Sequence, residues 1–459
     1  MSKILLISSN TTTEPMPVYP LGMALIASSL VQNGHEVKQL DLLFNLENIL
    51  SSVTCSISEF NPDFIGISIR NIDTVDSLSP ENTWYLADVK VLVEHIRKIS
   101  QKPIILGGPA FSIMPEQILE FLNADFGIVG EGEISFNKLI DTISNGVKTK
   151  KIIYPTKTPI TQNGFFSPLY EKELVAYYFD QSGMLSYQTK RGCPHGCNYC
   201  SYPLIEGNKL RNQTPEFVVD NLIRLKKNFN VDTLFFTDSV FNDCQGHYLT
   251  IAELMIKKKC NIKWAAHFRP EHIKQNELKL LKNSGLYAME VGSDAACDVT
   301  LQGINKSFNF EDIFSFNENC IKAEIPCAHF FMFGGPKETR ATVQEGLKNI
   351  DRLKKCAVFV FSGIRILPKT GLYEIAVKEG IISSNDNLLK PCYYVSPLVD
   401  KNWMDIKIKE AFHKKKDRFF PPEEGQMRMR ALKMFGFRGL LWDIAIIPKN
   451  RKKREFENQ

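Results

Sequence analysis

Short apolar runs alternate with amphipathic stretches along the first 145 residues. Continuous apolar runs predict buried strands, which we place at Lys3–Ser8, Glu36–Leu40, Phe64–Ile69, Pro103–Gly107 and Phe126–Val129. Apolar positions with helical periodicity predict the helices between them, at Leu21–Asn33, Trp84–Ser100 and Pro115–Leu122. Strand–helix alternation of this kind builds a doubly wound parallel sheet, which binds ligands beyond the carboxyl ends of its strands.

The alternation resumes at residue 181, after a segment over 146–180 that holds three prolines and two glycines and is predicted to be a linker with local strands. Six strands are predicted, at Leu185–Lys190, Thr233–Thr237, Lys263–His267, Leu286–Val291, Ala328–Phe333 and Val358–Ile364. The predicted helices between them are Pro215–Lys227, Tyr248–Lys258, Glu277–Asn283, Phe310–Lys322 and Thr339–Leu353. Six strand–helix units over 181–395 predict a partial parallel barrel whose active site lies on the loops after the strands.

The last segment, residues 396–459, is predicted to be helical and basic. Residues 401–459 hold 16 Lys and Arg against 8 Asp and Glu, whereas the whole chain carries only +5. The first 400 residues are therefore net acidic, and no nucleic-acid-binding surface is expected on them. Met427–Ile447 is amphipathic, which predicts one or two helices that close the barrel mouth, with contact at a membrane surface as the alternative.

Composition places the chain among soluble globular proteins. Hydrophobic residues make up 44% of it and charged residues 23%. Its 11 cysteines are odd in number and mostly scattered singly in apolar stretches, which indicates reduced thiols in a cytoplasmic protein. No apolar run is long enough to span a bilayer. The overall prediction is an α/β protein with two successive parallel-sheet domains, 1–145 and 181–395.

Three cysteines are grouped on the loop after the first barrel strand, in the run Cys193-Pro-His-Gly-Cys197-Asn-Tyr-Cys200. Three thiolates on one loop can hold three irons of a 4Fe–4S cluster and leave the fourth iron open for chemistry. The alternative is a structural zinc site, which needs a fourth ligand at suitable spacing. His195 lies inside the loop and Cys244 is far downstream, so neither fits that role well.

This spacing, with an aromatic residue just before the last cysteine, resembles that of the radical S-adenosylmethionine (SAM) superfamily. The resemblance implies a 4Fe–4S cluster on Cys193, Cys197 and Cys200, with SAM chelated at the open iron. One electron from the reduced cluster would cleave SAM to methionine and a 5′-deoxyadenosyl radical. The protein would bind and orient these groups and exclude water.

Other strand ends match the SAM-binding positions of this superfamily. Glu290 and Ser293 resemble the element that addresses the ribose hydroxyls, the alternative being a Glu packed within the barrel. Arg269 is expected to pair with the SAM carboxylate or to bridge barrel loops. The remaining expected SAM contacts are Tyr199, Asp238, Gly334 and Arg365.

The amino-terminal domain resembles the cobalamin-binding domain of cobalamin-dependent radical SAM enzymes. The resemblance rests on Ser68–Asp73, Ile105–Ser112 and Gly127–Glu133, whose small residues would let a bulky corrin approach the backbone. The expected cobalamin contacts are Ser68, Arg70, Gly107, Gly108, Gly130, Glu131 and Gly132. The loop Ser8–Pro17 lacks the Asp-x-His-x-x-Gly signature that supplies a histidine to cobalt. The lower face of the cobalt is therefore expected to meet water or a side chain such as Arg70.

The two domains in this order predict a cobalamin-dependent radical SAM enzyme that methylates an unactivated centre of a small-molecule or lipid-like substrate. One alternative keeps both cofactors but performs a rearrangement or cyclisation without methyl transfer. A non-enzymatic alternative is an iron–sulfur binding or regulatory protein. The radical mechanism also implies an electron donor such as flavodoxin or ferredoxin. Peripheral membrane contact through the basic tail stays open.

Overall fold

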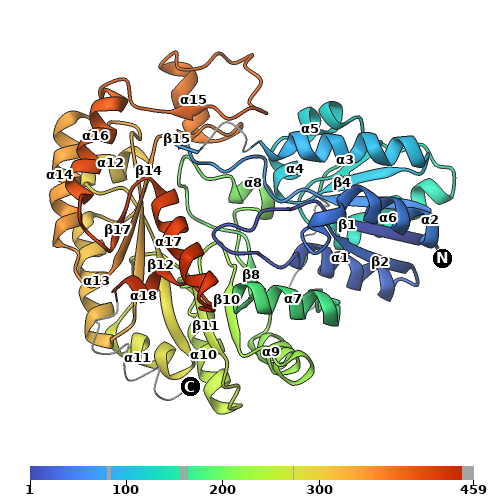
Figure 1. Ribbon diagram of the computed structural model, residues 1–459, viewed down its shortest axis with the longest axis horizontal. Coiled ribbons are helices and arrows are strands. Elements are labelled where there is room, and N and C mark those ends of the chain that lie inside the picture. Colours follow the sequence, from blue (N-terminus) through green and yellow to red (C-terminus); the bar gives the residue numbers. More distant parts are fainter. Residues whose placement is uncertain (80–83, 156–159, 161–163, 272, 447–459) are drawn as a thin grey trace.

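Two parallel β-sheets, each covered by helices, form the two lobes of the molecule (Figure 1). The computed structural model describes residues 1–79, 84–155, 160, 164–271 and 273–446. The amino-terminal sheet has six strands in the order β2-β1-β3-β4-β5-β6. Their bounds are β1 Lys3–Ser8, β2 Glu36–Asp41, β3 Phe64–Ser68, β4 Ile104–Gly107, β5 Phe126–Ile128 and β6 Ile152–Ile153. This is the doubly wound arrangement that the sequence predicts.

Helices lie on both faces of this first sheet. Those that contact one another and the strands are α1 Leu21–Gln32, α2 Ile49–Phe60, α3 Tyr85–Ile99, α4 Pro109–Ile113, α5 Pro115–Leu122 and α6 Gly132–Ser144. The central strands β1, β3 and β4 are mostly apolar because both of their faces are buried, as is usual for parallel sheets, whereas the edge strand β2 is more polar. Packing at the centre is close: a Cβ on Gly66 of β3 would lie 2.8 Å from the Leu6 side chain.

The second sheet forms an open barrel of seven parallel strands in the order β17-β14-β13-β12-β11-β10-β7. Their bounds are β7 Leu185–Tyr187, β10 Thr233–Phe236, β11 Lys263–Phe268, β12 Leu286–Asp294, β13 Cys327–Phe333, β14 Ala357–Ser362 and β17 Arg418–Phe419. The outer helices are α9 Pro215–Phe229, α10 His247–Lys257, α11 Gln275–Asn283, α12 Asp298–Gly303, α13 Phe310–Ala323 and α14 Arg340–Arg352. Six of the seven strands are those predicted from the sequence.

Local sequence explains where the outer helices begin and end. The Thr214 side chain accepts a hydrogen bond from the Phe217 backbone N–H, and Pro215 occupies the first turn of α9. Asn230 ends the same helix in the left-handed conformation. Capping by Thr339 begins α14 in the same way. These ends fix the lengths of the helices and hence the positions of the loops that follow the strands.

The predicted linker holds more regular structure than its sequence suggests. β6 adds a sixth strand to the first sheet beyond residue 145, and α7 (Lys172–Ser182) leads directly into the barrel. Pro159 of this segment lies outside the described residues. The predicted first barrel strand is divided into β7 and a short β8 (Lys190–Arg191), which pairs with β9 (Arg211–Asn212). The predicted sixth strand is likewise divided, into β14 and β15 (Ile364–Arg365).

The carboxyl-terminal segment is helical, as predicted, but it also supplies a strand. It contains α16 Lys401–Phe412, β17, α17 Pro422–Met434 and α18 Trp442–Ile446. β17 pairs with β14 and extends the barrel sheet. Two helices, α17 and α18, stand where one or two amphipathic helices are predicted, and both contact the barrel strands (Figure 1). The basic run 451–454 lies outside the described residues.

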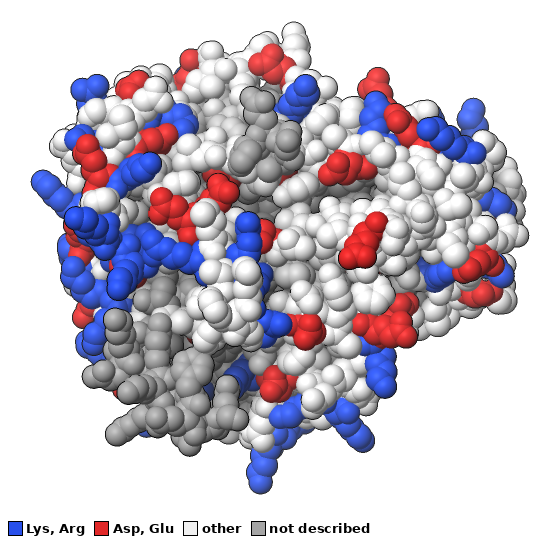
Figure 2. Space-filling model, in the orientation of Figure 1, with Lys and Arg blue, Asp and Glu red and all other residues white. Residues whose placement is uncertain are grey.

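Buried ion pairs join the two lobes. Arg365 Nε lies 2.8 Å from Asp73 Oδ2, and both side chains are almost wholly buried. Arg191 of β8 pairs with Glu133, the second residue of α6. On the outer surface, Figure 2 shows Lys and Arg side chains gathered on the barrel lobe and Asp and Glu scattered over both lobes. Among the described residues, no helix is long and apolar enough to cross a membrane.

Candidate active site

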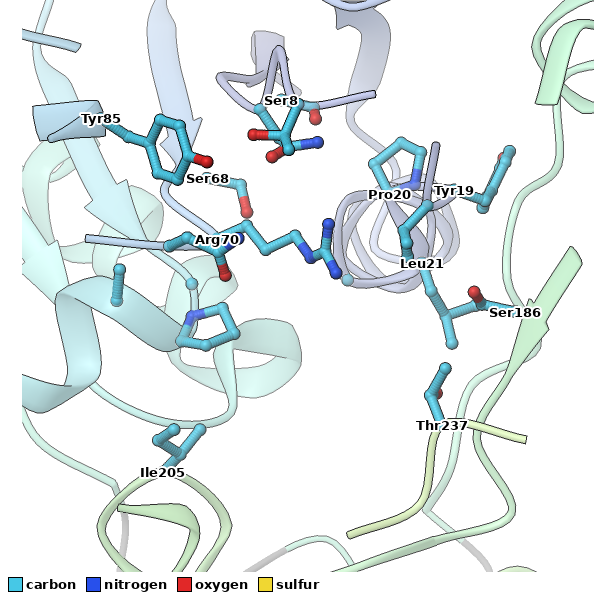
Figure 3. A pocket seen from close by; sticks show the side chains of 18 of the residues that line it. Ser8, Tyr19, Pro20, Leu21, Ser68, Arg70, Tyr85, Ser186, Ile205 and Thr237 are labelled. Atoms are coloured by element: carbon cyan, nitrogen blue, oxygen red, sulfur yellow. The ribbon is translucent and has the colours of Figure 1, made fainter. Parts of the chain in front are cut away.

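A large cavity of about 1290 Å³ lies between the two lobes and extends into the barrel. The strand ends of the first sheet form one wall, and side chains from the inside of the barrel form the other. Figure 3 shows Arg70 reaching into this space from the strand-end wall, while Leu21, Ser186 and Thr237 lie across from it. The volume exceeds that of an ordinary drug-sized pocket. One cavity therefore joins the strand ends of the first lobe to the inside of the barrel. The cysteine loop meets it through Ser201 and Tyr202, whereas the three cysteines are not among its lining residues.

The cysteine loop lies at the carboxyl end of the first barrel strand, as predicted. Gly192 begins it with a φ of +84°, and a Cβ there would lie 2.1 Å from the Lys209 carbonyl oxygen. Only glycine adopts this conformation with so little space. The loop is held by hydrogen bonds from Asn198 Nδ2 to the Gly303 carbonyl (2.8 Å) and from Leu372 N to the Asn198 carbonyl (2.8 Å).

The three cysteine side chains are partly buried beside two cationic groups. Burial raises the pKa of Cys193 and raises that of Cys200 to about 12, and the neighbouring thiols add to both shifts. Arg269 Nη1 lies 3.9 Å from Cys197 Sγ, and the buried Lys306 ammonium is also close enough to interact with Cys197. Metal ligation requires thiolates, and these cations favour them. The donor set and its charge environment thus fit an anionic iron–sulfur cluster.

No three His, Cys, Asp or Glu side chains of the described residues converge on a point where they would hold a single metal ion. His195, inside the loop, has its pKa lowered to about 4, mainly by burial. The cysteines therefore do not assemble with another side chain into a single-ion site of the zinc type.

Arg269 bridges barrel loops, which is one of the two roles that the sequence left open, and its pairing with the SAM carboxylate stays a prediction. Its Nε lies 2.8 Å from Glu271 Oε2, and its Nη2 donates to Ser307 Oγ at 2.8 Å. Ser307 in turn donates to Glu271. Arg269 therefore bridges barrel loops while one guanidinium nitrogen faces the cysteine loop. Glu271 and Ser307 are members of this site that the sequence reasoning missed.

The ion pair between Asp294 and Lys306, which lies beside the predicted Tyr199, was also missed. Asp294, the last residue of β12, forms an ion pair with Lys306. The Lys306 ammonium lies 5.4 Å from the centre of the Tyr199 ring. Tyr199 is thus near the cysteines, as predicted, and is joined to β12 through the ion pair. Period-two alternation from Glu290 would have placed Asp294 on the same face of β12.

Glu290 lines the cavity, whereas Ser293 does not. The Glu290 carboxylate accepts from Trp442 Nε1 at 3.2 Å and lies 3.4 Å from His267 Nδ1, and burial raises its pKa. Ser293 points to the opposite face of β12, where it is 2.8 Å from the buried His329 Nδ1. The structure therefore does not bring the two predicted ribose contacts together.

Three other predicted SAM contacts have their own partners. Asp238 accepts from the Thr189 hydroxyl and from the backbone N–H groups of Thr189 and Lys190. Arg365 donates to Asp73 and to the carbonyls of Ile366 and Leu388, so its guanidinium is taken up between the lobes. Gly334 has a φ of +87° and donates its N–H to Glu338 at 3.2 Å. Asp238 and Arg365 therefore stabilise the structure around the site, and Gly334 forms a tight turn.

The expected cobalamin contacts come together along one wall of the cavity. All seven lie on it: Ser68, Arg70, Gly107, Gly108, Gly130, Glu131 and Gly132. Gly108 has a φ of +96°, and a Cβ there would lie 2.6 Å from the Ile69 carbonyl oxygen. The Glu131 carboxylate is already paired with Arg191 and Arg211. The wall is thus mostly backbone and small side chains, which suits a flat, bulky ligand.

Polar atoms without partners face the same region. Asn10 Nδ2 and Thr12 Oγ1, on the cavity-lining loop after β1, are buried and make no hydrogen bond within the described residues. Arg70 extends into the cavity with no carboxylate of the described residues paired to it, and the enclosure lowers its pKa. A buried polar atom without a partner is costly, so a polar ligand is expected here. The amide-rimmed corrin of cobalamin fits this donor set.

Two family models match the chain in agreement with this geometry. The B12 binding domain matches residues 9–140, and the radical SAM superfamily matches residues 187–350. An uncharacterized methyltransferase of Pyrococcus horikoshii is 25% identical over 81% of this chain and 80% of its own length. The tryptophan 2-C-methyltransferase of Streptomyces laurentii is 20% identical over 78% of this chain and 72% of its own length.

Solved structures show the same fold over nearly the whole chain. The radical SAM methyltransferase TsrM of Kitasatospora setae, solved with cobalamin and a [4Fe-4S] cluster bound, has a TM-score of 0.84 and 22% identity, covering 99% of this chain and 100% of its own. OxsB, a cobalamin-dependent SAM radical enzyme, has a TM-score of 0.72 and 15% identity, covering 97% of this chain and 72% of its own. Both predicted domains and their order are confirmed: a B12 binding domain precedes a radical SAM superfamily domain, and the chain is similar over nearly its whole length to the radical SAM methyltransferase TsrM.

Proposed function

We propose that this protein methylates an unactivated centre of a small molecule bound inside the barrel. The observation that carries the proposal is the continuity of the cavity. The same space is lined by the strand ends of the B12-binding domain and by barrel residues such as Thr237 and Glu290. A methyl group carried on one wall thus needs no passage through solvent to reach a substrate on the other.

The two lobes would hold different cofactors. Cys193, Cys197 and Cys200 would hold the cluster, with Arg269 and Lys306 balancing its charge. The small residues after β3, β4 and β5 would hold the corrin, with Arg70 towards its lower face. When bound, the cluster would supply the electron that cleaves SAM, and cobalamin would carry the methyl group.

An electron donor such as flavodoxin or ferredoxin is part of this proposal. Pro194 and Gly196 of the cysteine loop are exposed, while the cysteines themselves are only partly accessible. A docked reductant could therefore approach the loop from outside without entering the cavity. The substrate would remain enclosed on the other side.

Methyl-labelled SAM tests the proposal. The reconstituted enzyme is incubated anaerobically with a reductant and a small-molecule extract, and label is followed into bound cobalamin and into new products. Label is expected in both. Cys197→Ala should retain cobalamin but lose SAM cleavage, because the cluster lacks one of its three ligands. Product formation without label would favour rearrangement or cyclisation, and cleavage retained in Cys197→Ala would refute the cluster assignment.

A further inference from the structure

The carboxyl-terminal segment forms the floor of the barrel half of the cavity. Leu440, Leu441 and Trp442 are 2–3% exposed and pack against a layer of small residues inside the barrel. That layer consists of Ala265, Ala288, Ala328 and Ala357, one from each of four neighbouring strands. Small side chains here leave room for an indole ring. Trp442 and Leu440 both line the cavity, so this segment sets its depth.

The walls above this floor are aromatic. Phe235, Phe330, Phe359 and Phe361 line the cavity from β10, β13 and β14. The rings of Phe330 and Phe359 are stacked with centroids 5.1 Å apart, and the His267 ring meets Phe235 edge-on at 4.8 Å. Flat walls of this kind favour a flat, apolar ligand.

The charge within this half of the cavity is acidic. Glu290 lies above the floor with Trp442 Nε1 on one oxygen and His267 near the other. A carboxylate has about four acceptor positions, so it has room for a further donor. The only Lys or Arg side chains among the described residues that line the cavity are Arg70 and Arg191. Arg70 is on the opposite wall and Arg191 is paired with Glu133, so neither is available to an anion near Glu290.

We propose that this chamber binds a flat, largely apolar molecule that carries an ammonium or N–H group, with Glu290 as its acceptor and Trp442 as the floor beneath it. The inference rests on the proposed function, because it names the substrate class of the same cavity. An ammonium would offset the cost of keeping the Glu290 carboxylate out of water. A carboxylate or phosphate would face that charge with no free cation nearby.

Binding measurements test this independently of turnover. The probes are 2-phenylethylamine, 2-phenylethanol and 3-phenylpropanoate, which share an aromatic ring and differ in charge. Equilibrium dialysis against the holoenzyme with SAM present, at neutral pH, should show the amine binding at least about tenfold more tightly than the acid. Equal or tighter binding of the acid would overturn the proposal. Because no methyl transfer is needed, this result is separate from the labelling experiment.

Two glutamate-to-glutamine variants separate a specific role of Glu290 from a general effect of negative charge in the cavity. Glu290→Gln should weaken the amine about tenfold and leave the alcohol unchanged. The matched control is Glu423→Gln, since Glu423 of α17 also lines the cavity and should leave both affinities unchanged. An unchanged amine affinity in Glu290→Gln would refute the proposal. So would loss of SAM affinity alone, which would place this carboxylate at the ribose instead.

Variants of Trp442 test whether this side chain limits the depth of the chamber. Trp442→Ala should let the chamber accept 2-(4-biphenylyl)ethylamine, whose second ring needs more depth, several-fold more tightly than the wild type does. Trp442→Phe keeps a ring in place and should not show this gain, which controls for general loosening of the segment. The same affinity for the longer amine in all three proteins would show that Trp442 does not limit the chamber.

Discussion

Asp238 illustrates how a single buried carboxylate supports the cysteine loop. It accepts from Thr189 and Lys190, the residues that lead into the loop, and it is fully buried. Burial raises its pKa to about 6, above the ordinary value of 3.8. The folded protein therefore takes up this proton at a higher pH than the unfolded chain does.

This difference gives the pH dependence of stability a definite sign. Because the folded-state pKa is raised, the contribution of Asp238 to the free energy of unfolding falls as pH rises through 6. Between pH 5 and pH 7 we expect a loss of about 1 kcal/mol from this group. Asp238→Asn cannot titrate, so its stability relative to wild type should rise by that amount over the same range. Urea unfolding at both pH values measures it, and parallel pH profiles would contradict the assignment.

At the residue level, a motif identifies candidate ligands, whereas the facing direction of single side chains is harder to predict. The cysteines and Tyr199 are named from spacing alone, and their roles stay predictions. Ser293 was named as a ribose contact and Asp294 was not considered, although period-two alternation from Glu290 would place Asp294 on the same face of β12. Lys306 was missed because it lies on a loop, where no periodicity shows which side chains turn towards the site.

The cysteine loop shows at the scale of the element how backbone geometry positions a cofactor. Gly192 at its start is confined by the Lys209 carbonyl, whereas a Cβ on Gly196 would meet only the Asn305 side chain, at 3.1 Å. A side-chain amide can move aside more easily than a backbone carbonyl. Two glycines four residues apart are therefore not equivalent.

Alanine at each of these glycines should separate their roles. Gly192→Ala is expected to cost at least about 2 kcal/mol, because it combines a positive φ with a backbone clash, and to lower the iron bound after anaerobic reconstitution. Gly196→Ala should retain most of the iron. Iron and sulfide analysis with a melting curve for each variant checks this. Equal iron retention in the two would show that the close approach at Gly192 does not shape the loop.

Strands with continuous apolar runs were predictable, and very short ones were not. The five predicted strands of the first sheet and the six of the barrel are present, and most of them are runs of buried apolar residues; the edge strand β2 is the more polar one. β6 and β17 have only two residues each, and their pairing depends on partners far along the chain. The positions of the two helices in the carboxyl-terminal segment likewise depend on packing against the barrel. The periodicity of the segment does not reveal this packing.

At the scale of the whole molecule, the cavity exists only because the two lobes are held in a fixed relation. The Asp73–Arg365 pair joins residues 292 positions apart, and no pattern in the sequence connects them. Arg365 was expected to contact SAM, a role that sequence alone could not distinguish from holding the lobes together. The division into two domains was predictable, whereas the contacts between them were not.

Removing one partner of this pair should be costly. Arg365→Met leaves Asp73 buried without its counter-charge and is expected to lower the free energy of unfolding by about 3–5 kcal/mol. Asp73→Asn keeps the acceptor that binds the Val75 N–H and isolates the charge. The double variant should be less destabilised than the two single variants together. Additive effects in this double-mutant cycle would show that the pair does not couple the lobes.

The claim that the cluster and cobalamin lie close together where the two lobes meet is tested most directly by electron paramagnetic resonance. The protein is reconstituted with the cluster reduced and cobalamin in its Co(II) state, so that both centres are paramagnetic in the same chain. Dipolar interaction falls steeply with distance, so a cluster on the cysteine loop and a cobalamin on the strand-end wall should broaden or split each other's signals. A spectrum that is the simple sum of the two isolated centres would contradict the account.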